Sequence, residues 1–155
     1  MDEAQQTSAR RDTLSTQCPT CGHTGRLVDT QTVKAMLAIS LCAVRPTLYY
    51  FCATADCPTV YFAKDGAQQF GEEVLRVPVY QKQPQNAHVL ICYCFDHTPQ
   101  SIRDEWQQTG HSTVVETITV GTQTGQCACD IRNPQGTCCL GNVRQFVRQM
   151  TQSAR

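Results

Sequence analysis

Cysteine is the residue type best placed to carry chemistry in this sequence, and eleven of its 155 residues are cysteine. Most of them stand in close pairs, in the stretches CPTC, CATADC, CYC and QCACDIRNPQGTCC. Clustered thiols can close disulfides, bind metal ions or react as thiolates. The total is odd, and the polar N-terminal stretch has no apolar segment typical of a secretory signal, so we expect a cytoplasmic protein with reduced thiols. Metal binding is therefore favoured over a disulfide scaffold.

The first two cysteine pairs have the spacing of a structural zinc site. Cys18 and Cys21 are separated by two residues and followed by a glycine, so both sulfurs can turn toward one point. Cys52 and Cys57 form a second pair with four residues between them. Two such pairs predict a tetrahedral site of the zinc-ribbon kind. The alternative is a redox dithiol at CPTC, which the matching second pair disfavours.

The later cysteines predict a different centre. Cys92 and Cys94 end an apolar run before one expected helix, and Cys138 and Cys139 precede another. Free N–H groups at helix N-termini favour negative charge. A [2Fe–2S] cluster held by four thiolates is an anion, and N–H groups aimed at its sulfurs stabilise the reduced form. We therefore predict a [2Fe–2S] cluster here, with a second zinc as the alternative.

Strands are expected to position the first two pairs. Aromatic and β-branched residues predict strands at 47–52 and 59–66, joined as a hairpin by the Cys52–Cys57 loop. The apolar run at 33–42 is compatible with a short helix, in which Cys42 would be a buried free thiol. A further edge strand is predicted at 77–82.

Helices are expected to position the later pairs. Residues 98–110 have a capping Thr98, a proline at the first helical position and a terminating Gly110. Residues 111–125 fit either a strand or a helix, and we favour a helix because Thr113 and Glu116 could form a capping box. The segment 140–150 has an amphipathic helical stripe. Its apolar positions are Val143, Phe146, Val147 and Met150.

These expectations combine into an α+β chain, in which a small zinc-stapled β unit precedes a helical [2Fe–2S]-binding unit. The predicted organisation is a disordered tail at 1–16, a zinc-binding β subdomain at 17–83, a linker at 84–88, a helical iron–sulfur subdomain at 89–151 and a tail at 152–155.

The same motifs resemble a known family. In order and spacing, CPTCG, YYFCATADCPTVYF, VPVYQK, CYCF and GQCACDIRNPQGTCCLGNV are similar to the N-terminal domain of the CopZ copper chaperones, over about residues 17–144. The helical half also resembles bacterioferritin-associated ferredoxin, a helical [2Fe–2S] protein. The resemblance implies one zinc and one [2Fe–2S] cluster.

The resemblance also implies which cysteines bind each group. Its zinc ligands correspond to Cys18, Cys21, Cys52 and Cys57, and its cluster ligands correspond to Cys92, Cys94, Cys129 and one of the adjacent pair Cys138 and Cys139. We favour Cys139, which stands at the expected helix start. Cys42 and Cys127 are extra to the family pattern. The family's full-length chaperone carries an MxCxxC copper site, and this sequence has no such motif, so the resemblance does not predict a self-sufficient copper shuttle.

Composition and the remaining residues limit the function classes. The formal net charge is zero, so nucleic acid is not an expected partner. No apolar run is long enough to span a membrane. His88, His97 and His111 are scattered and fit surface or capping roles, although His97 stands three residues after Cys94. We therefore expect no enzyme, and at most a stoichiometric metal reductase.

The sequence thus predicts a metallochaperone-like redox protein linked to copper handling. It would transfer single electrons, could reduce Cu(II) to Cu(I), and could hold Cu(I) on thiols outside the cluster, since Cu(I) prefers soft sulfur ligands. Expected partners are copper-handling proteins or an electron-donating reductase. A ferredoxin-like carrier and a metal-stabilised interaction module are the alternatives.

Overall fold

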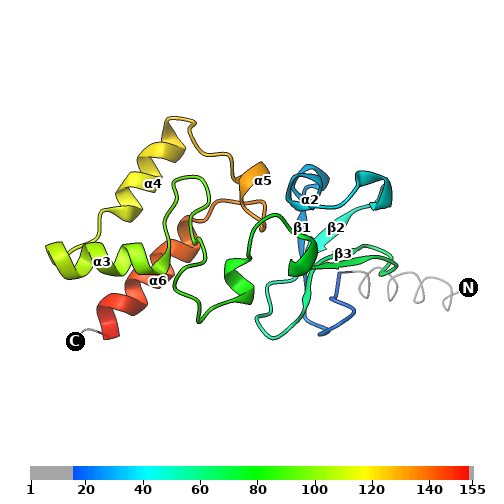
Figure 1. Cartoon of the computed structure of the whole chain (residues 1–155), viewed down its shortest axis with the longest axis horizontal. Coiled ribbons are helices and arrows are strands. Elements are labelled where there is room, and N and C mark those ends of the chain that lie inside the picture. Colours follow the sequence, from blue (N-terminus) through cyan, green and yellow to red (C-terminus); the bar gives the residue numbers. More distant parts are fainter. Residues whose placement is uncertain (1–15, 154–155) are drawn as a thin grey trace, which may run out of the picture. The chain divides into compact units, whose positions relative to one another are not determined.

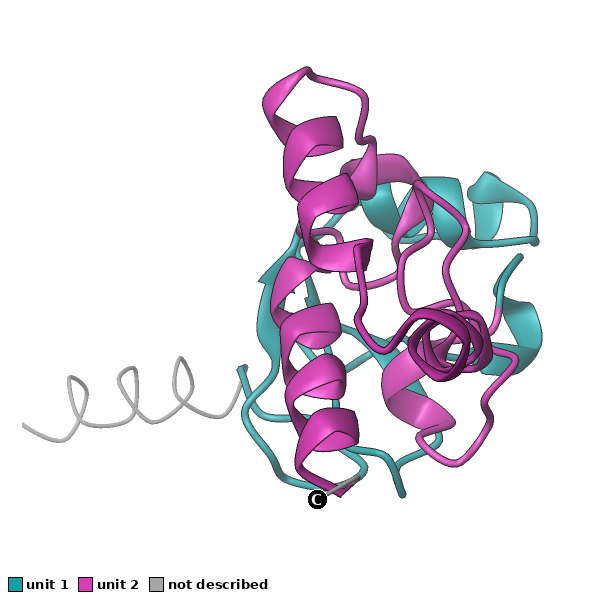
Figure 2. Cartoon of the chain, turned by 90° about the vertical axis from the view of Figure 1, so that its left-hand side faces the viewer, with its two compact units in different colours: residues 1–77 teal, residues 78–155 magenta. Residues whose placement is uncertain are grey.

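The structure is a computed structural model that describes residues 16–153. The chain divides into two compact units, unit 1 ending at Val77 and unit 2 beginning at Pro78 (Figures 1 and 2). The disordered tail predicted at 1–16 lies almost wholly outside the described residues. None of the described helices is long and apolar enough to cross a membrane.

A four-stranded antiparallel sheet forms unit 1, with its strands in sequence order. The strands are β1 (Arg26–Val28), β2 (Tyr49–Phe51), β3 (Thr59–Ala63) and β4 (Gln69–Gly71). The predicted hairpin is confirmed, because β2 pairs with β3 with Tyr50 opposite Phe62. Every residue of β3 is buried, so this strand is the centre of the unit. The strands β1 and β4 were not predicted, since three residues give no readable alternation.

The helix predicted at 33–42 is displaced toward the N-terminus. Helix α2 (Thr30–Met36) starts earlier because the Asp29 carboxylate accepts a hydrogen bond from the Gln31 N–H and caps it. It ends at Met36, and the chain then forms a 3₁₀ turn, η1 (Leu41–Ala43). A second 3₁₀ turn, η2 (Glu72–Val74), follows β4.

A glycine allows close packing beneath the first cysteine pair. A Cβ atom at Gly25 would lie 2.5 Å from Cζ of Phe62, a fully buried ring that stacks on Tyr50 with 5.5 Å between centroids. We expect Gly25→Ala to lower the free energy of unfolding of unit 1 by about 1–3 kcal/mol, as overpacking does. Thermal or urea unfolding followed by circular dichroism measures this. Gly141→Ala is the control: Gly141 lies in a helix with open space around it, so that change should be neutral or stabilising.

Unit 2 is helical, with α3 (Pro99–Thr109), α4 (Val114–Gln123), α5 (Cys129–Arg132) and α6 (Leu140–Ser153). The start of α3 is as predicted: the Thr98 hydroxyl accepts from the Ser101 N–H at 3.0 Å. The helix ends at Gly110, which has φ 78°. Residues 111–125 do contain a helix, but the predicted capping box is wrong. The Thr113 side chain makes no cap, and its N–H instead donates to the carboxylate of Glu105.

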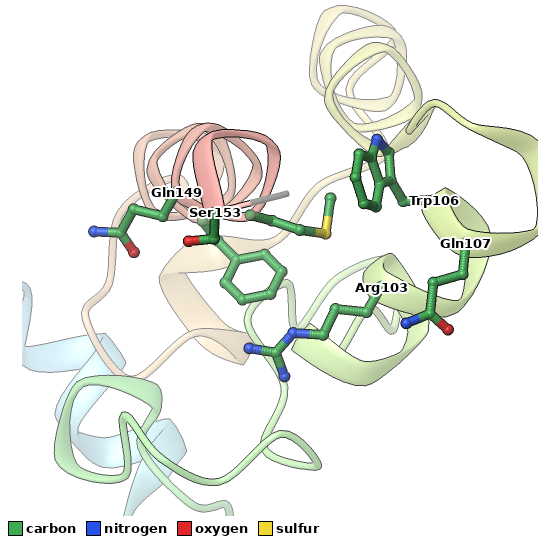
Figure 3. Close-up of a pocket in the computed structure, with 7 residues that line it drawn as sticks. Arg103, Trp106, Gln107, Gln149 and Ser153 are labelled. Atoms are coloured by element: carbon green, nitrogen blue, oxygen red, sulfur yellow. The ribbon is translucent and has the colours of Figure 1, made fainter. Parts of the chain in front are cut away.

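The predicted stripe of α6 faces the core of unit 2. Val143 is fully buried, and Phe146, Val147 and Met150 pack against that core. The helix extends to Ser153, into the segment expected to be a tail. Between α3 and α6 lies a groove of about 420 Å³, where the Arg103 guanidinium stands 5.1 Å from the centroid of the Phe146 ring (Figure 3).

Residues 78–83 belong to unit 2, so the division falls before the linker expected at 84–88. The predicted edge strand at 77–82 is wrong, because the segment forms a 3₁₀ turn, η3 (Tyr80–Lys82). The Tyr93 hydroxyl explains this conformation: it donates to the Pro78 carbonyl at 2.6 Å and accepts from the Tyr80 N–H at 3.1 Å. These bonds hold the segment to Tyr93, between Cys92 and Cys94, and engage backbone groups that a strand would use for pairing.

Candidate metal centres

The first centre begins with the turn at Cys18–Gly22. The Gly22 N–H donates to the Cys18 carbonyl at 2.8 Å, and the Cys18 N–H donates to the His23 carbonyl at 2.8 Å. Gly22 has φ 77°, in the left-handed region that a residue with a Cβ rarely adopts. The turn therefore folds back as expected and directs the two sulfurs to one side.

The β2–β3 connection supplies the other two sulfurs. Cys52 follows β2, and its N–H donates to the Val60 carbonyl at 2.8 Å, which continues the hairpin ladder. The Sγ atoms of Cys18 and Cys57 are 3.7 Å apart, and those of Cys21 and Cys52 are also 3.7 Å apart. All four sulfurs lie within 4.8 Å of one another. A tetrahedral zinc with Zn–S bonds of about 2.3 Å requires sulfurs about 3.8 Å apart, so this Cys₄ group fits zinc.

The environment of these thiols differs from sulfur to sulfur. Burial raises the pKa of Cys57 to about 12. Burial also acts to raise the pKa of Cys21, but hydrogen bonds with the Thr54 hydroxyl and with the backbone and side chain of His23 outweigh it and lower the pKa to about 5. A cation that binds all four thiols must displace their remaining protons, so its affinity should rise with pH.

One cysteine of unit 1 differs from expectation, and one histidine contacts a sulfur of this centre. Cys42 is exposed rather than buried, because α2 ends at Met36 and the thiol lies on the 3₁₀ turn η1. His23 is exposed, and its contact with the Cys21 thiol places it beside a sulfur, outside the Cys₄ group.

The second centre lies in unit 2 and brings together thiols from three segments. The Sγ atoms of Cys94 and Cys129 are 3.5 Å apart. Cys139 is buried in the core with Cys92, and its thiol hydrogen-bonds to those of Cys92 and Cys129. The structure therefore gathers Cys92, Cys94, Cys129 and Cys139 in one place, while Cys138 is exposed.

Hydrogen bonds favour thiolates at some of these positions. The Cys139 thiol lowers the pKa of Cys92 to about 7 and that of Cys129 to about 6. Burial raises the pKa of Cys94 to about 11, although the Ala128 N–H donates to its sulfur at 3.2 Å. The hydrogen bonds with Cys129 and Cys92 raise the pKa of Cys139. Backbone donors thus already point at sulfur, as a site for an anionic centre requires.

The four thiols of unit 2 are spaced more widely than those of unit 1. In unit 1 the four sulfurs all lie within 4.8 Å of one another. Within residues 16–153, no three thiols of unit 2 lie that close together. They instead form a chain of neighbours, in which Cys129 contacts both Cys94 and Cys139, and Cys139 also contacts Cys92. One tetrahedral ion would need all four sulfurs at mutual contact.

A buried amide network holds the loop that delivers Cys139. Gln135 is 5% exposed, and its Nε2 donates to the carbonyls of Thr137 and Cys138 at 3.0 and 2.9 Å. Its Oε1 accepts from Gln81 at 2.6 Å and from Asn142 at 3.0 Å. No sequence pattern indicated this role, since the partners of a buried amide depend on tertiary structure.

We expect Gln135→Leu to lower the free energy of unfolding of unit 2 by about 1–3 kcal/mol, because the Cys138 carbonyl loses its donor and the amides of Gln81 and Asn142 lose their acceptor. Hydrogen exchange of peptides from 89–153 would show it as faster exchange around 133–139. Gln145→Leu is the matched control, since Gln145 is exposed on α6 and the change should stay within about 0.5 kcal/mol. Equal effects of the two substitutions would contradict the role given to Gln135.

Comparisons with known proteins agree with the geometry of unit 1. A family model described as a zinc binding domain, of the CopZ type, matches residues 15–76. The X-ray structure of the Archaeoglobus fulgidus CopZ N-terminal domain is similar, with a TM-score of 0.69 and 27% identity over 84% of this chain and 96% of that chain. No curated protein sequence matches. Unit 1 is therefore a CopZ-like zinc-binding domain, and the fold similarity extends beyond it into unit 2.

Proposed function

We propose that this protein binds one zinc ion in unit 1 and one [2Fe–2S] cluster in unit 2, and that it serves copper handling as a carrier of single electrons. The zinc ion would be structural, because four protein sulfurs surround its position and leave no open coordination site. Redox chemistry would then belong to unit 2.

The observation that supports the cluster is the gathering of four thiols from three segments of unit 2, spaced more widely than the unit 1 group. Cys92, Cys94, Cys129 and Cys139 would together supply the four thiolate ligands of its two irons. Such a cluster supplies one electron at a time at a potential set by its surroundings. The chain's own part is to hold four thiolates, to direct the Ala128 N–H at sulfur, and to exclude water from Cys92 and Cys139, which are 0% and 2% exposed.

The link to copper rests on the similarity to the CopZ N-terminal domain and on two thiols outside the group of four. Cys138 is exposed and adjacent in sequence to Cys139, and Cys127 is half-buried and stands two residues before Cys129. One electron reduces one Cu(II) ion to Cu(I), which prefers soft sulfur ligands. A reductase would supply that electron from outside. No enzymatic residue is assigned, and the protein would act at most as a stoichiometric metal reductase.

Metal analysis of anaerobically purified protein tests the cluster. We expect iron and acid-labile sulfide in equal amounts, together with zinc, and an EPR signal that appears on reduction. A colourless protein with two zincs per chain and no iron would contradict the proposal.

Copper is tested separately, on the protein with its cluster in place. We expect Cu(I), presented with a competing chelator, to bind more tightly to the natural sequence than to the double variant Cys127→Ser, Cys138→Ser. Equal binding would remove the copper assignment and favour the alternative, a ferredoxin-like carrier for a reductase.

A further inference from the structure

One buried polar atom in unit 2 makes no hydrogen bond within residues 16–153. The atom is Nε2 of His97, and among the described residues it is the one buried side-chain nitrogen or oxygen that has no hydrogen-bond partner. Leaving a buried donor or acceptor unpaired costs free energy, so such an atom requires an explanation, and an absent ion or group is one of the few available.

The backbone pairs this histidine with Cys92, a member of the second thiol group. Cys92 and His97 form an antiparallel bridge in which each N–H donates to the other's carbonyl, at 3.2 and 3.1 Å. A residue pair that exchanges both bonds has Cα atoms about 5.5 Å apart and side chains on the same face. Asp96, with φ 63°, closes the tight turn that returns the chain. The His97 side chain therefore lies on the face that carries the buried Cys92 thiol.

We propose that the Nε2–H of His97 donates a hydrogen bond to a sulfur of the [2Fe–2S] cluster held by Cys92, Cys94, Cys129 and Cys139. The inference rests on the proposed function, since it needs the cluster to be present. His97 is a positioning residue: it ligates no iron, and it stabilises the extra negative charge of the reduced state. The cluster sulfur in turn satisfies the orphaned nitrogen.

Substitution at position 97 tests the donor. His97→Leu should shift the midpoint potential of the cluster to a lower value and shorten the half-life of its visible absorption in air. His97→Gln places an amide near the same point and should restore the potential toward that of the natural protein. His111→Leu is the matched control, because His111 is exposed and lies at the end of α3. Zinc content should stay constant in all variants.

A second measurement needs no variant and covers the case in which His97→Leu fails to fold. In reduced protein labelled with ¹⁵N-histidine, pulsed EPR should detect one weakly coupled nitrogen, as a hydrogen-bonded imidazole gives. A strongly coupled nitrogen would mean direct ligation and would overturn the donor role.

Different experimental results would overturn this inference and the proposed function. If the natural protein contains the cluster but His97→Leu has an unchanged potential, or no nitrogen coupling appears, the inference alone is overturned. If the natural protein holds no iron at all, both fall.

Discussion

Removal of zinc is expected to unfold unit 1 while the helices of unit 2 stay folded. The sheet of unit 1 has three strands of only three residues, and the Cys18–Gly22 turn is joined to the β2–β3 hairpin through the sulfur group. Structural zinc contributes on the order of 10 kcal/mol to the folding of small zinc-binding units, more than a sheet of this size can replace.

The substitution Cys57→Ala should also unfold unit 1, without the use of a chelator to remove the zinc. This thiol is 5% exposed and lies at the hairpin end, so its loss leaves three sulfurs and an open position. We expect zinc affinity to fall by more than the roughly 10–100-fold that loss of an outer partner costs. Hydrogen exchange measured peptide by peptide should show β2 and β3 losing protection and α3, α4 and α6 keeping it.

Cys42→Ala is the matched control for this experiment. Cys42 is a cysteine of the same unit, but it is exposed on η1 and lies outside the Cys₄ group. The Cys42→Ala variant should bind zinc as tightly as the natural sequence does. Protected β2 and β3 amides in a zinc-free chain would show that the sheet stands without its metal, and would contradict a structural role for zinc.

The zinc centre could be predicted from sequence because its geometry is local. One turn carries Cys18 and Cys21, and one hairpin end carries Cys52 and Cys57. Only the contact between these two pairs had to be inferred. The helices could be predicted for the same reason, since caps such as Thr98 act within one turn. Where a distant residue intervenes, as Glu105 does at Thr113, the local signal gave the wrong cap.

The second centre could be predicted only in part, because it depends on tertiary contacts. Sequence patterns placed Cys92, Cys94 and the adjacent pair before helices, but Cys129 came from a resemblance, as it lies 35 residues beyond its neighbour Cys94. Gln135 gave no sequence signal of its role, and the signal for His97 was only its place three residues after Cys94. A buried amide network and an unpaired imidazole become visible only once the loop and the Cys92–His97 bridge are in place.

Adjacent cysteines give the sharpest test of the second centre. We expect Cys139→Ala to abolish the cluster and Cys138→Ala to retain it. Cys139 is 2% exposed and hydrogen-bonded with the thiols of Cys92 and Cys129, whereas Cys138 is exposed to solvent. Because neighbouring side chains diverge, both cannot face the same centre. Alanine is the better replacement at 139, since a serine hydroxyl could itself bind iron and would bury a polar group in an apolar core.

The readout is iron per chain and visible absorption after anaerobic reconstitution, with zinc counted in the same samples. Zinc should be unchanged in both variants, because the Cys₄ group belongs to unit 1. Loss of iron from Cys138→Ala with retention in Cys139→Ala would reverse the ligand assignment. The loop would then have to turn the exposed Cys138 side chain inward and the buried Cys139 side chain outward, although the Gln135 amide holds this backbone through the Cys138 carbonyl at 2.9 Å. The arrangement of the loop therefore favours Cys139 as the ligand.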